Sequence, residues 1–551
     1  MSALAIAAPT DWAGVPDTSL ANLGAYSRFV WRSNWLRLAV WALLTVGMIG
    51  FVAVYYLRMF GTDWQALKDF GDIAATPPMN ALVGVITNPY TLGGAIWCKY
   101  WMFGAMMLQI GLLYLTTRNL RGDEDAGRAE LTRAYPLGLH SRLLATVWIN
   151  IAGALVIGVL CGPMVASVIS QSDWGGGATG AYMFGLSVAT MGILGVGIAA
   201  FTNQVAPTNG GANGLGVGAI AVFYVIRMVG DMNSADVLLW ISPIGWGQKV
   251  DPWGANRAWP MLLQVLLALV LIAVAWMLET RRDLGAGLVA ARPGSSKALR
   301  LTTTSVGLSL RTQRASIIAW LLGVMIMGDL LGGVVQKMAD MIESSGAFTG
   351  AAVQAGLNGT VALMAGIMAL AITAFAIQSV STVRANEEAG LAEAQLAGPL
   401  SRTGWALRRL AVAFVVTIVV LVVAGGMMGY AYVASGQGID PSWQTTCVKA
   451  VLVYLPAVAL LMSVFVLGFG WWPRQCVAVT WAVLALMFIG TIVGVATGIP
   501  QRILDLMPYQ ALPAIPAVPM NWTPVLVESA IAVVFTVAGL AGFRRRNVPV
   551  L

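Results

Sequence analysis

Charged side chains are scarce in this chain. Asp, Glu, Lys and Arg together make up 10% of its 551 residues, whereas hydrophobic residues make up 58%. A soluble domain typically has about 25% charged and about 45–50% apolar residues, so this chain lacks the charge to cover a soluble surface. The composition excludes a water-soluble globular protein and indicates a protein whose solvent is lipid.

Cysteine and histidine, which build disulfide frameworks and zinc sites, are also rare. The four cysteines lie singly in apolar stretches without a CxxC pair, and His140 is the only histidine. This spacing excludes both kinds of site and identifies the cysteines as small buried hydrophobic residues. We expect His140 to lie on the surface without a functional partner.

The sequence contains no G-x-x-x-x-G-K-[ST] loop, the motif that cradles ATP phosphates. It also shows no recognisable constellation of catalytic residues. We therefore expect a transport subunit rather than an enzyme, with no cofactor in this chain. If transport is driven by ATP, the ATPase is another chain.

Long apolar runs are abundant. A membrane-spanning helix needs about 20 mostly apolar residues, and we identify twelve such runs. They predict an all-α, polytopic protein of the bacterial plasma membrane. The predicted spans are 36–60, 91–116, 143–170, 177–202, 212–230, 259–279, 315–336, 357–383, 405–434, 446–472, 476–498 and 523–543.

The basic residues predict the orientation of these spans. With a cytoplasmic N-terminus, the cytoplasmic segments hold most of the 32 Lys and Arg residues, including Arg544, Arg545 and Arg546 after the last span. Positive charge accumulates in cytoplasmic loops. Both termini are therefore predicted to be cytoplasmic.

An acidic cytoplasmic segment after the second span recurs after the eighth, at a constant offset of 263 residues. Asp125 in the first copy corresponds to another acidic residue, Glu388, in the second. Six spans per copy give two tandem units of the same orientation, 1–290 and 291–551. We expect each unit to begin with an interfacial helix, the second after a cytoplasmic linker. The matched residues are Arg121, Glu124, Gly127, Glu130 and Pro136 in the first copy, and Arg384, Glu387, Gly390, Glu393 and Pro399 in the second.

Each copy has the pattern of a short, acidic interfacial helix. Acidic residues at its start complement the helix dipole, Glu124 and Arg128 are spaced as an i,i+4 pair, and Pro136 ends the helix. Packing alone gives no reason for a polar loop to keep the same letters in both halves. A cytoplasmic partner that contacts both halves equivalently does.

These motifs carry a resemblance to a known family. The E-E-x-G-x-x-E…P-x-S-R pattern at 387–402, with six spans per unit, resembles the permeases of type-2 ABC exporters. The fused two-unit length and the stretch RRDLGAGL at 281–288 are similar to an actinobacterial subgroup. That subgroup exports drugs and polyketide antibiotics of the tetronasin type.

The resemblance implies that 121–136 and 384–402 are coupling helices for two copies of a separate ATPase, which would bind ATP and Mg. It also implies connecting helices at 20–34 and about 300–314, and partly re-entrant elements at 231–258 and 499–522. The first copy departs from the family pattern by a three-residue insertion before Arg142. We therefore expect the two coupling segments to be related but not equivalent.

Ionisable residues inside spans are candidates for a substrate pathway. Lys99 and Asp329 lie within the second and seventh spans, whereas Arg227 and Glu528 lie near span ends and are expected to reach water. Methionine adapts to ligands of varied shape, so methionines spaced i,i+4 on the second and eighth spans could form a pliable lining. These methionines are Met102, Met106, Met364 and Met368.

The predicted function is the membrane subunit of an ATP-driven exporter that moves hydrophobic drugs or antibiotics by alternating access. Two alternatives remain open. A proton-driven multidrug carrier also has twelve spans, but usually carries a basic G-x-x-x-D-R-x-G-R-R loop where this chain is acidic. A membrane enzyme that modifies lipids would need outward carboxylates beside a lipid groove, and Asp63, Asp69 and Asp72 form no recognisable set.

Overall fold

The computed structural model divides into two compact units, Met1–Pro293 and Gly294–Leu551, which are described separately. Every regular element in the described residues is a helix, and eleven helices there are long and apolar enough to cross a membrane. The chain is therefore a polytopic all-α membrane protein. The described residues are 18–75, 79–80, 83–85, 87–283, 285–289, 304–344, 351–398, 400–435, 439–496 and 507–546.

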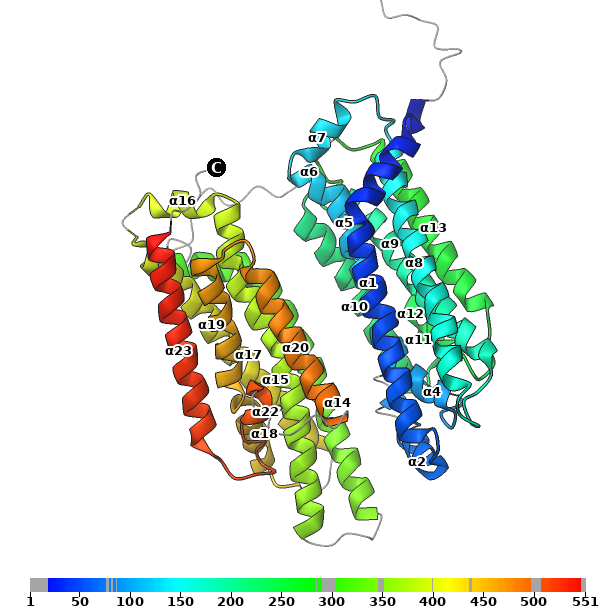
Figure 1. Cartoon of the computed structure of the whole chain (residues 1–551), viewed down its shortest axis with the longest axis vertical. Helices are drawn as coiled ribbons and strands as arrows, with labels where there is room; N and C mark the ends of the chain where they lie inside the picture. The colour runs from blue at the N-terminus through cyan, green and yellow to red at the C-terminus, as the bar shows by residue number, and fades with distance from the viewer. Residues whose placement is uncertain are drawn as a thin grey trace, which may run out of the picture. The chain divides into compact units, whose positions relative to one another are not determined.

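Helix α9 (Ala178–Val205) is the centre of the first unit, where α5, α8 and α13 pack against it (Figure 1). Most of α9 is buried. The other elements are the 3-10 turn Thr18–Leu20, α1 (Leu23–Phe60), α2 (Trp64–Ala74), α4 (Leu92–Ile96), the π-helical turn Trp97–Trp101, α5 (Met102–Thr117), the π-helical turn Arg118–Gly122, α6 (Asp123–Asp125), α7 (Arg128–Arg133), α8 (Ser141–Ile169), α10 (Asn209–Met232), α11 (Asp236–Ile241), α12 (Pro243–Gln248) and α13 (Trp259–Glu279).

The second unit repeats the neighbour pairs of the first. Its first helix packs on its third span, and its last helix packs on α19, as α1 packs on α8 and α13 on α9. The elements are α14 (Ser305–Ser344), α15 (Ala351–Glu388), α16 (Leu391–Leu396), α17 (Arg402–Ser435), α18 (Ser442–Leu452), α19 (Leu455–Trp471), α20 (Cys476–Ala496), α22 (Pro508–Ala511) and α23 (Trp522–Arg545).

Two predicted spans differ in detail from the structure. The run 446–472 is divided into α18 and α19, because Pro456 in the first turn of α19 has no N–H to continue the hydrogen-bond ladder. The run 476–498 corresponds to α20, of which Cys476–Phe488 is a shorter apolar helix and does not count among the eleven.

The predicted connecting segments are continuous with the first span of each unit. Helix α1 runs without interruption over 38 residues and α14 over 40, about 57 and 60 Å by helical rise. Neither helix contains a proline, so nothing breaks the backbone between an interfacial turn and the span. Residues 300–303 of the second predicted segment lie outside the described residues.

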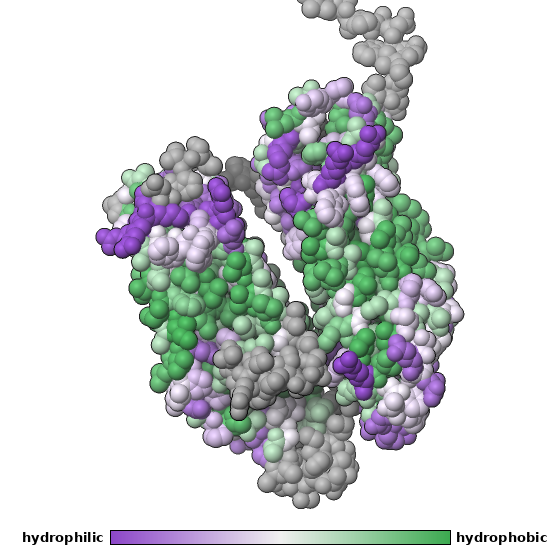
Figure 2. Space-filling view, viewed as in Figure 1, coloured by the Kyte–Doolittle hydropathy of each residue, from purple (hydrophilic) through white to green (hydrophobic). Residues whose placement is uncertain are grey.

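The outer surface of each unit has the polarity expected of a membrane protein. On the face seen in Figure 2, a broad apolar band covers the middle of the helices of each unit, and hydrophilic residues gather toward their ends. Large apolar side chains such as Leu43, Leu262 and Val533 are more than half exposed. Lipid is the solvent that satisfies such a surface.

Close backbone contact holds α8 and α9 together. A Cβ added at Gly185 would lie 2.4 Å from the carbonyl oxygen of Gly158 and 2.7 Å from the amide of Gly162. Small residues of this kind let membrane helices approach and gain van der Waals contact.

We expect Gly185→Ala to lower the stability of the purified protein by about 1–3 kcal/mol, because the methyl group forces the two helices apart. The matched control is Gly218→Ala in α10, where a Cβ meets nothing within 4 Å and helix propensity should raise stability by up to about 1 kcal/mol. Thermal unfolding in detergent measures both variants, and equal shifts would contradict the close-contact assignment.

Candidate functional site

The two repeated acidic segments share one backbone conformation. Gly127 has φ 69° and ψ −1°, Gly390 has φ 69° and ψ 0°, and each is followed by a six-residue helix, α7 or α16. A positive φ is unfavourable for residues with a Cβ, so both copies require glycine here. Ala129 and Ala392, two residues further on, are both buried against their units.

Each short helix presents an exposed face. In the first copy Leu131 is 70% exposed and Tyr135 is 76% exposed, and Leu391 is 52% exposed in the second. Large apolar side chains exposed among charges at a bundle end are typical of a protein contact. Among the matched residues, the exposed ones are Asp125, Gly127, Glu130, Pro136, Glu388 and Glu393, while Pro399 lies outside the described residues.

Glu124 does not belong to that exposed face. Its side chain is fully buried and accepts hydrogen bonds from three arginines. Arg282 binds it through both terminal nitrogens, Nη1 to Oε2 at 2.9 Å and Nη2 to Oε1 at 2.8 Å. Arg121 Nη1 lies 2.7 Å from Oε2, and Arg142 bonds to Oε1. Such charge-assisted pairs offset the cost of burying the carboxylate.

The arginines of this cluster also bind the end of α9, through one backbone and one side-chain oxygen. Arg121 Nη2 donates to the carbonyl oxygen of Asn203 at 2.6 Å, and Arg282 Nε donates to Gln204 Oε1 at 2.5 Å. Asp125 accepts from the amide of Asn209 at 2.7 Å, at the first residue of α10. The first acidic segment is therefore tied to the ends of several spans at once.

Glu387 has the same position in the second unit, with a side chain 1% exposed. Arg384 Nη1 donates to its Oε2 at 2.8 Å, as Arg121 does to Glu124. Arg546, at the end of α23, places Nη2 2.7 Å from Oε1 as an ion pair without aligned hydrogen-bond geometry. Arg402 is not bonded to this glutamate and donates instead to the carbonyl oxygen of Arg546 at 2.8 Å.

Sequence reasoning missed the inward role of Arg142, Arg282 and Arg546. Arg282 and Arg546 follow the last span of each unit in arginine runs, which predicted the topology and, for 281–288, the family resemblance. Arg142 lies instead in the first turn of α8. The predicted pair of Glu124 with Arg128 is wrong. Arg128 instead bonds to Asp123 at 2.7 Å, because Glu124 points into the unit.

The prediction that His140 is a surface residue is also wrong. The ring is buried, its Nδ1 lies 2.8 Å from Glu279 Oε2, and it stacks on Trp276 at 4.2 Å. The three-residue insertion folds back onto the N-terminal segment, where the amides of Gly138 and His140 donate to the carbonyl oxygens of Ala21 and Ser19. This fold carries His140 to the end of α13.

The candidate pathway residues differ in exposure within their own units, and their role in a pathway stays a prediction. Lys99 and Asp329 are exposed on their helices. Met102 and Met368 are fully buried core residues. Met106 and Met364 are half-buried and pack against the cores of their own units.

We expected Arg227 and Glu528 to reach water, but both side chains are buried. Arg227 is fully buried and its Nη1 lies 2.9 Å from Asp231 Oδ2, an i,i+4 pair near the end of α10. Glu528 is 6% exposed, and neither carboxylate oxygen has a hydrogen-bond partner among the described residues. Tertiary packing buries both side chains although each lies near a helix end.

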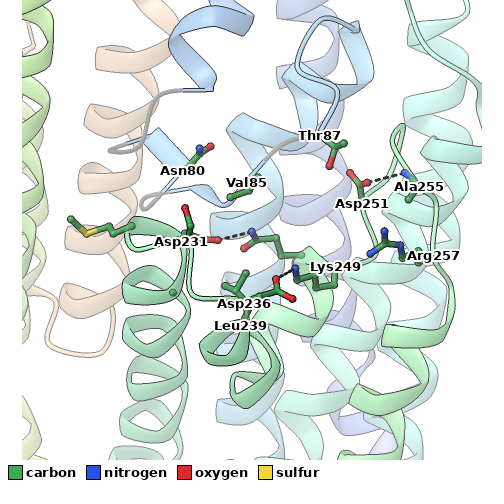
Figure 3. Close-up of a pocket in the computed structure, with 14 residues that line it drawn as sticks. Asn80, Val85, Thr87, Asp231, Asp236, Leu239, Lys249, Asp251, Ala255 and Arg257 are labelled. Atoms are coloured by element: carbon green, nitrogen blue, oxygen red, sulfur yellow. Dashed lines mark hydrogen bonds and ion pairs between the residues drawn. The ribbon is translucent and has the colours of Figure 1, made fainter.

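A polar cavity of about 560 Å³ lies at the end of the first unit remote from the acidic segment. Helix α10 starts beside Asp125 and ends at the cavity, 24 residues and about 36 Å away. Gln248 donates to Asp231 at 2.9 Å in the wall, and the Lys249 ion pair holds the pKa of Asp236 below its ordinary value (Figure 3). Residues 231–258 thus form two short helices and a polar opening.

Comparison with known proteins decides the family. A family model described as "Multidrug efflux system permease Rv1217c, C-terminal domain" matches residues 303–544. The chain is also 30% identical over 531 residues to the multidrug efflux system permease protein Rv1217c of Mycobacterium tuberculosis, across 95% of this chain and 94% of that protein. The chain belongs to the Rv1217c permease family. Together with the apolar helices, this membership makes the chain a multi-pass cell-membrane protein and a transport permease.

Glu387 is buried in this permease whereas Glu388 is exposed, so substitutions at the two positions should differ in their effect on stability. Glu387→Gln should destabilise the protein by about 3–5 kcal/mol, since Arg384 and Arg546 would lose their buried counter-charge. Glu388→Gln should cost only about 0–1 kcal/mol, because that side chain is 61% exposed. Unfolding of both variants in detergent measures the difference, and similar stabilities would show that the buried pairs contribute nothing.

Proposed function

We propose that this chain is the membrane subunit of an ATP-driven ABC-type exporter for hydrophobic drugs or antibiotics, including polyketides of the tetronasin type. Its substrate pathway would open alternately to the two sides of the membrane. The energy would come from two copies of a separate ATPase that bind ATP and Mg. The relationship to a multidrug efflux system permease supports the transport role and the substrate class.

The observation that carries the ATP-driven part is the pair of acidic segments with equal backbone and an exposed face. Two related platforms, the exposed faces around α7 and α16, fit two copies of one partner better than they fit two unrelated contacts. We propose twelve spans in two repeats of one orientation, with both termini and both platforms in the cytoplasm. The platforms would contact the ATPase through exposed residues such as Tyr135 and Leu391. The buried Glu124 and Glu387 would hold the platforms to their units through their arginine contacts.

A proton-driven carrier is the second candidate, and Glu528 favours it. A carboxyl group buried in a span without a hydrogen-bond partner is a default candidate for proton binding. One such group among the described residues is fewer than a proton relay needs, so we rank this function below the ATP-driven exporter.

We expect an ATPase encoded beside this chain to copurify at two copies per chain. The double change Leu131→Glu and Tyr135→Glu should weaken that association at least about tenfold, or about 1.4 kcal/mol, because it places charge in the contact. Val237→Glu, at a 72% exposed site in α11, is the matched control and should change nothing.

Drug efflux from cells separates the two functions. Efflux that needs the ATPase and survives a protonophore supports the exporter. No copurifying ATPase, together with efflux that stops with the proton gradient and in Glu528→Gln, would overturn the exporter in favour of the carrier.

A further inference from the structure

The last span of each unit ends in a run of arginines, and one arginine of each run turns inward. Arg281 and Arg545 are exposed, whereas the side chains of Arg282 and Arg546 are 6% and 16% exposed. Each of these two binds the buried glutamate at the start of the acidic segment. An arginine after the last span therefore meets the buried glutamate in both units, through hydrogen bonds in the first and an ion pair in the second, although the local sequences, RRD and RRR, differ.

Along the chain, the last span of each unit is not adjacent to the acidic segment. The first segment joins α5 to α8 through the backbone, but Arg282 is 158 residues away from Glu124 along the chain. In the second unit, α23 meets the segment through Arg546. Motion of the segment can reach the last span only through packing and contacts of this kind.

The inward arginines are held firmly at their helix ends. Arg282 makes a two-pronged contact with Glu124 and also donates to Gln204 and to the carbonyl oxygen of Ala286. A forked guanidinium bonded to a carboxylate fixes orientation as well as distance.

Arg546 is fixed by its surroundings in a different way. Its guanidinium lies 5.0 Å from the centre of the Phe469 ring and 5.4 Å from that of Phe543, and its carbonyl oxygen accepts from Arg402. Cation–π contacts hold an arginine over the ring faces. The ion pair with Glu387 thus joins the acidic segment to both α19 and α23.

We propose that Arg282 and Arg546 are positioning residues that transmit movement of each acidic segment to the last span of its unit. This inference rests on the proposed function, in which the segments receive the ATPase. The two links are unequal. Without Arg282, Glu124 retains Arg121 and Arg142. Without Arg546, Glu387 retains Arg384 as its one ion-pair partner among the described residues.

The experiment compares Arg282→Ala and Arg546→Ala with the matched neighbours Arg281→Ala and Arg545→Ala, each copurified with the ATPase. The measured quantity is drug transported per ATP hydrolysed in proteoliposomes, with ATPase binding and thermal stability recorded for the same samples. We expect Arg546→Ala to retain the ATPase but to lower this ratio at least about fivefold. Arg282→Ala should lower it less, and the two neighbours should not change it.

Four further variants keep the test decisive if Arg546→Ala does not fold. Arg546→Lys should restore part of the ratio, and exchange of the charges in Glu387→Arg with Arg546→Glu should restore more than either single change. If Arg546→Lys also fails to fold, the pair is a folding contact only and the proposal is overturned. An unchanged ratio in Arg546→Ala, or loss of ATPase binding, overturns it as well.

These outcomes are distinct from failure of the proposed function. In that case the unaltered chain itself would bind no ATPase, and the ratio could not be measured for any variant. The transmission proposal would then fall with the function on which it rests.

Discussion

A carboxylate that is buried away from water needs positively charged partners, and this requirement determines the arrangement at one end of each unit. Glu124 and Glu387 begin the acidic segments, and each is buried, so each recruits arginines from several helices. An unpaired buried charge costs several kcal/mol, which leaves little freedom for the partners. The buried carboxylate of each unit thus holds three parts together: the acidic segment, the adjoining spans and the end of the last helix.

The middle of the bundle obeys a different constraint. Lipid offers no hydrophobic driving force between helices, so association depends on close packing. In the first unit α9 makes this close packing, because its Gly185 lets the backbone of α8 approach. Large apolar residues face outward. Polar contacts therefore determine the arrangement at the bundle end, and backbone proximity determines it within the apolar band.

The two units keep the same buried glutamate but support it unequally. The insertion in the first unit brings His140 to Glu279 and ties residues 138–140 to the N-terminal segment. Arg142 bonds to Glu124, whereas Arg402 bonds to a backbone carbonyl. A repeated sequence motif has thus acquired two mechanically different surroundings, of which the first is the more heavily braced.

The sequence by itself determined the helical class and the approximate positions of the apolar helices, because length and hydropathy act locally, and its repeated letters marked the two acidic segments. Only tertiary structure decided that Glu124 turns inward while Asp125, one residue on, is exposed. Successive residues point about 100° apart on a helix, so the direction depends on where the helix packs. Charge counting could not separate Arg282 from Arg281, nor predict a buried His140. Those outcomes depend on partners up to 158 residues away, which meet only when the spans assemble.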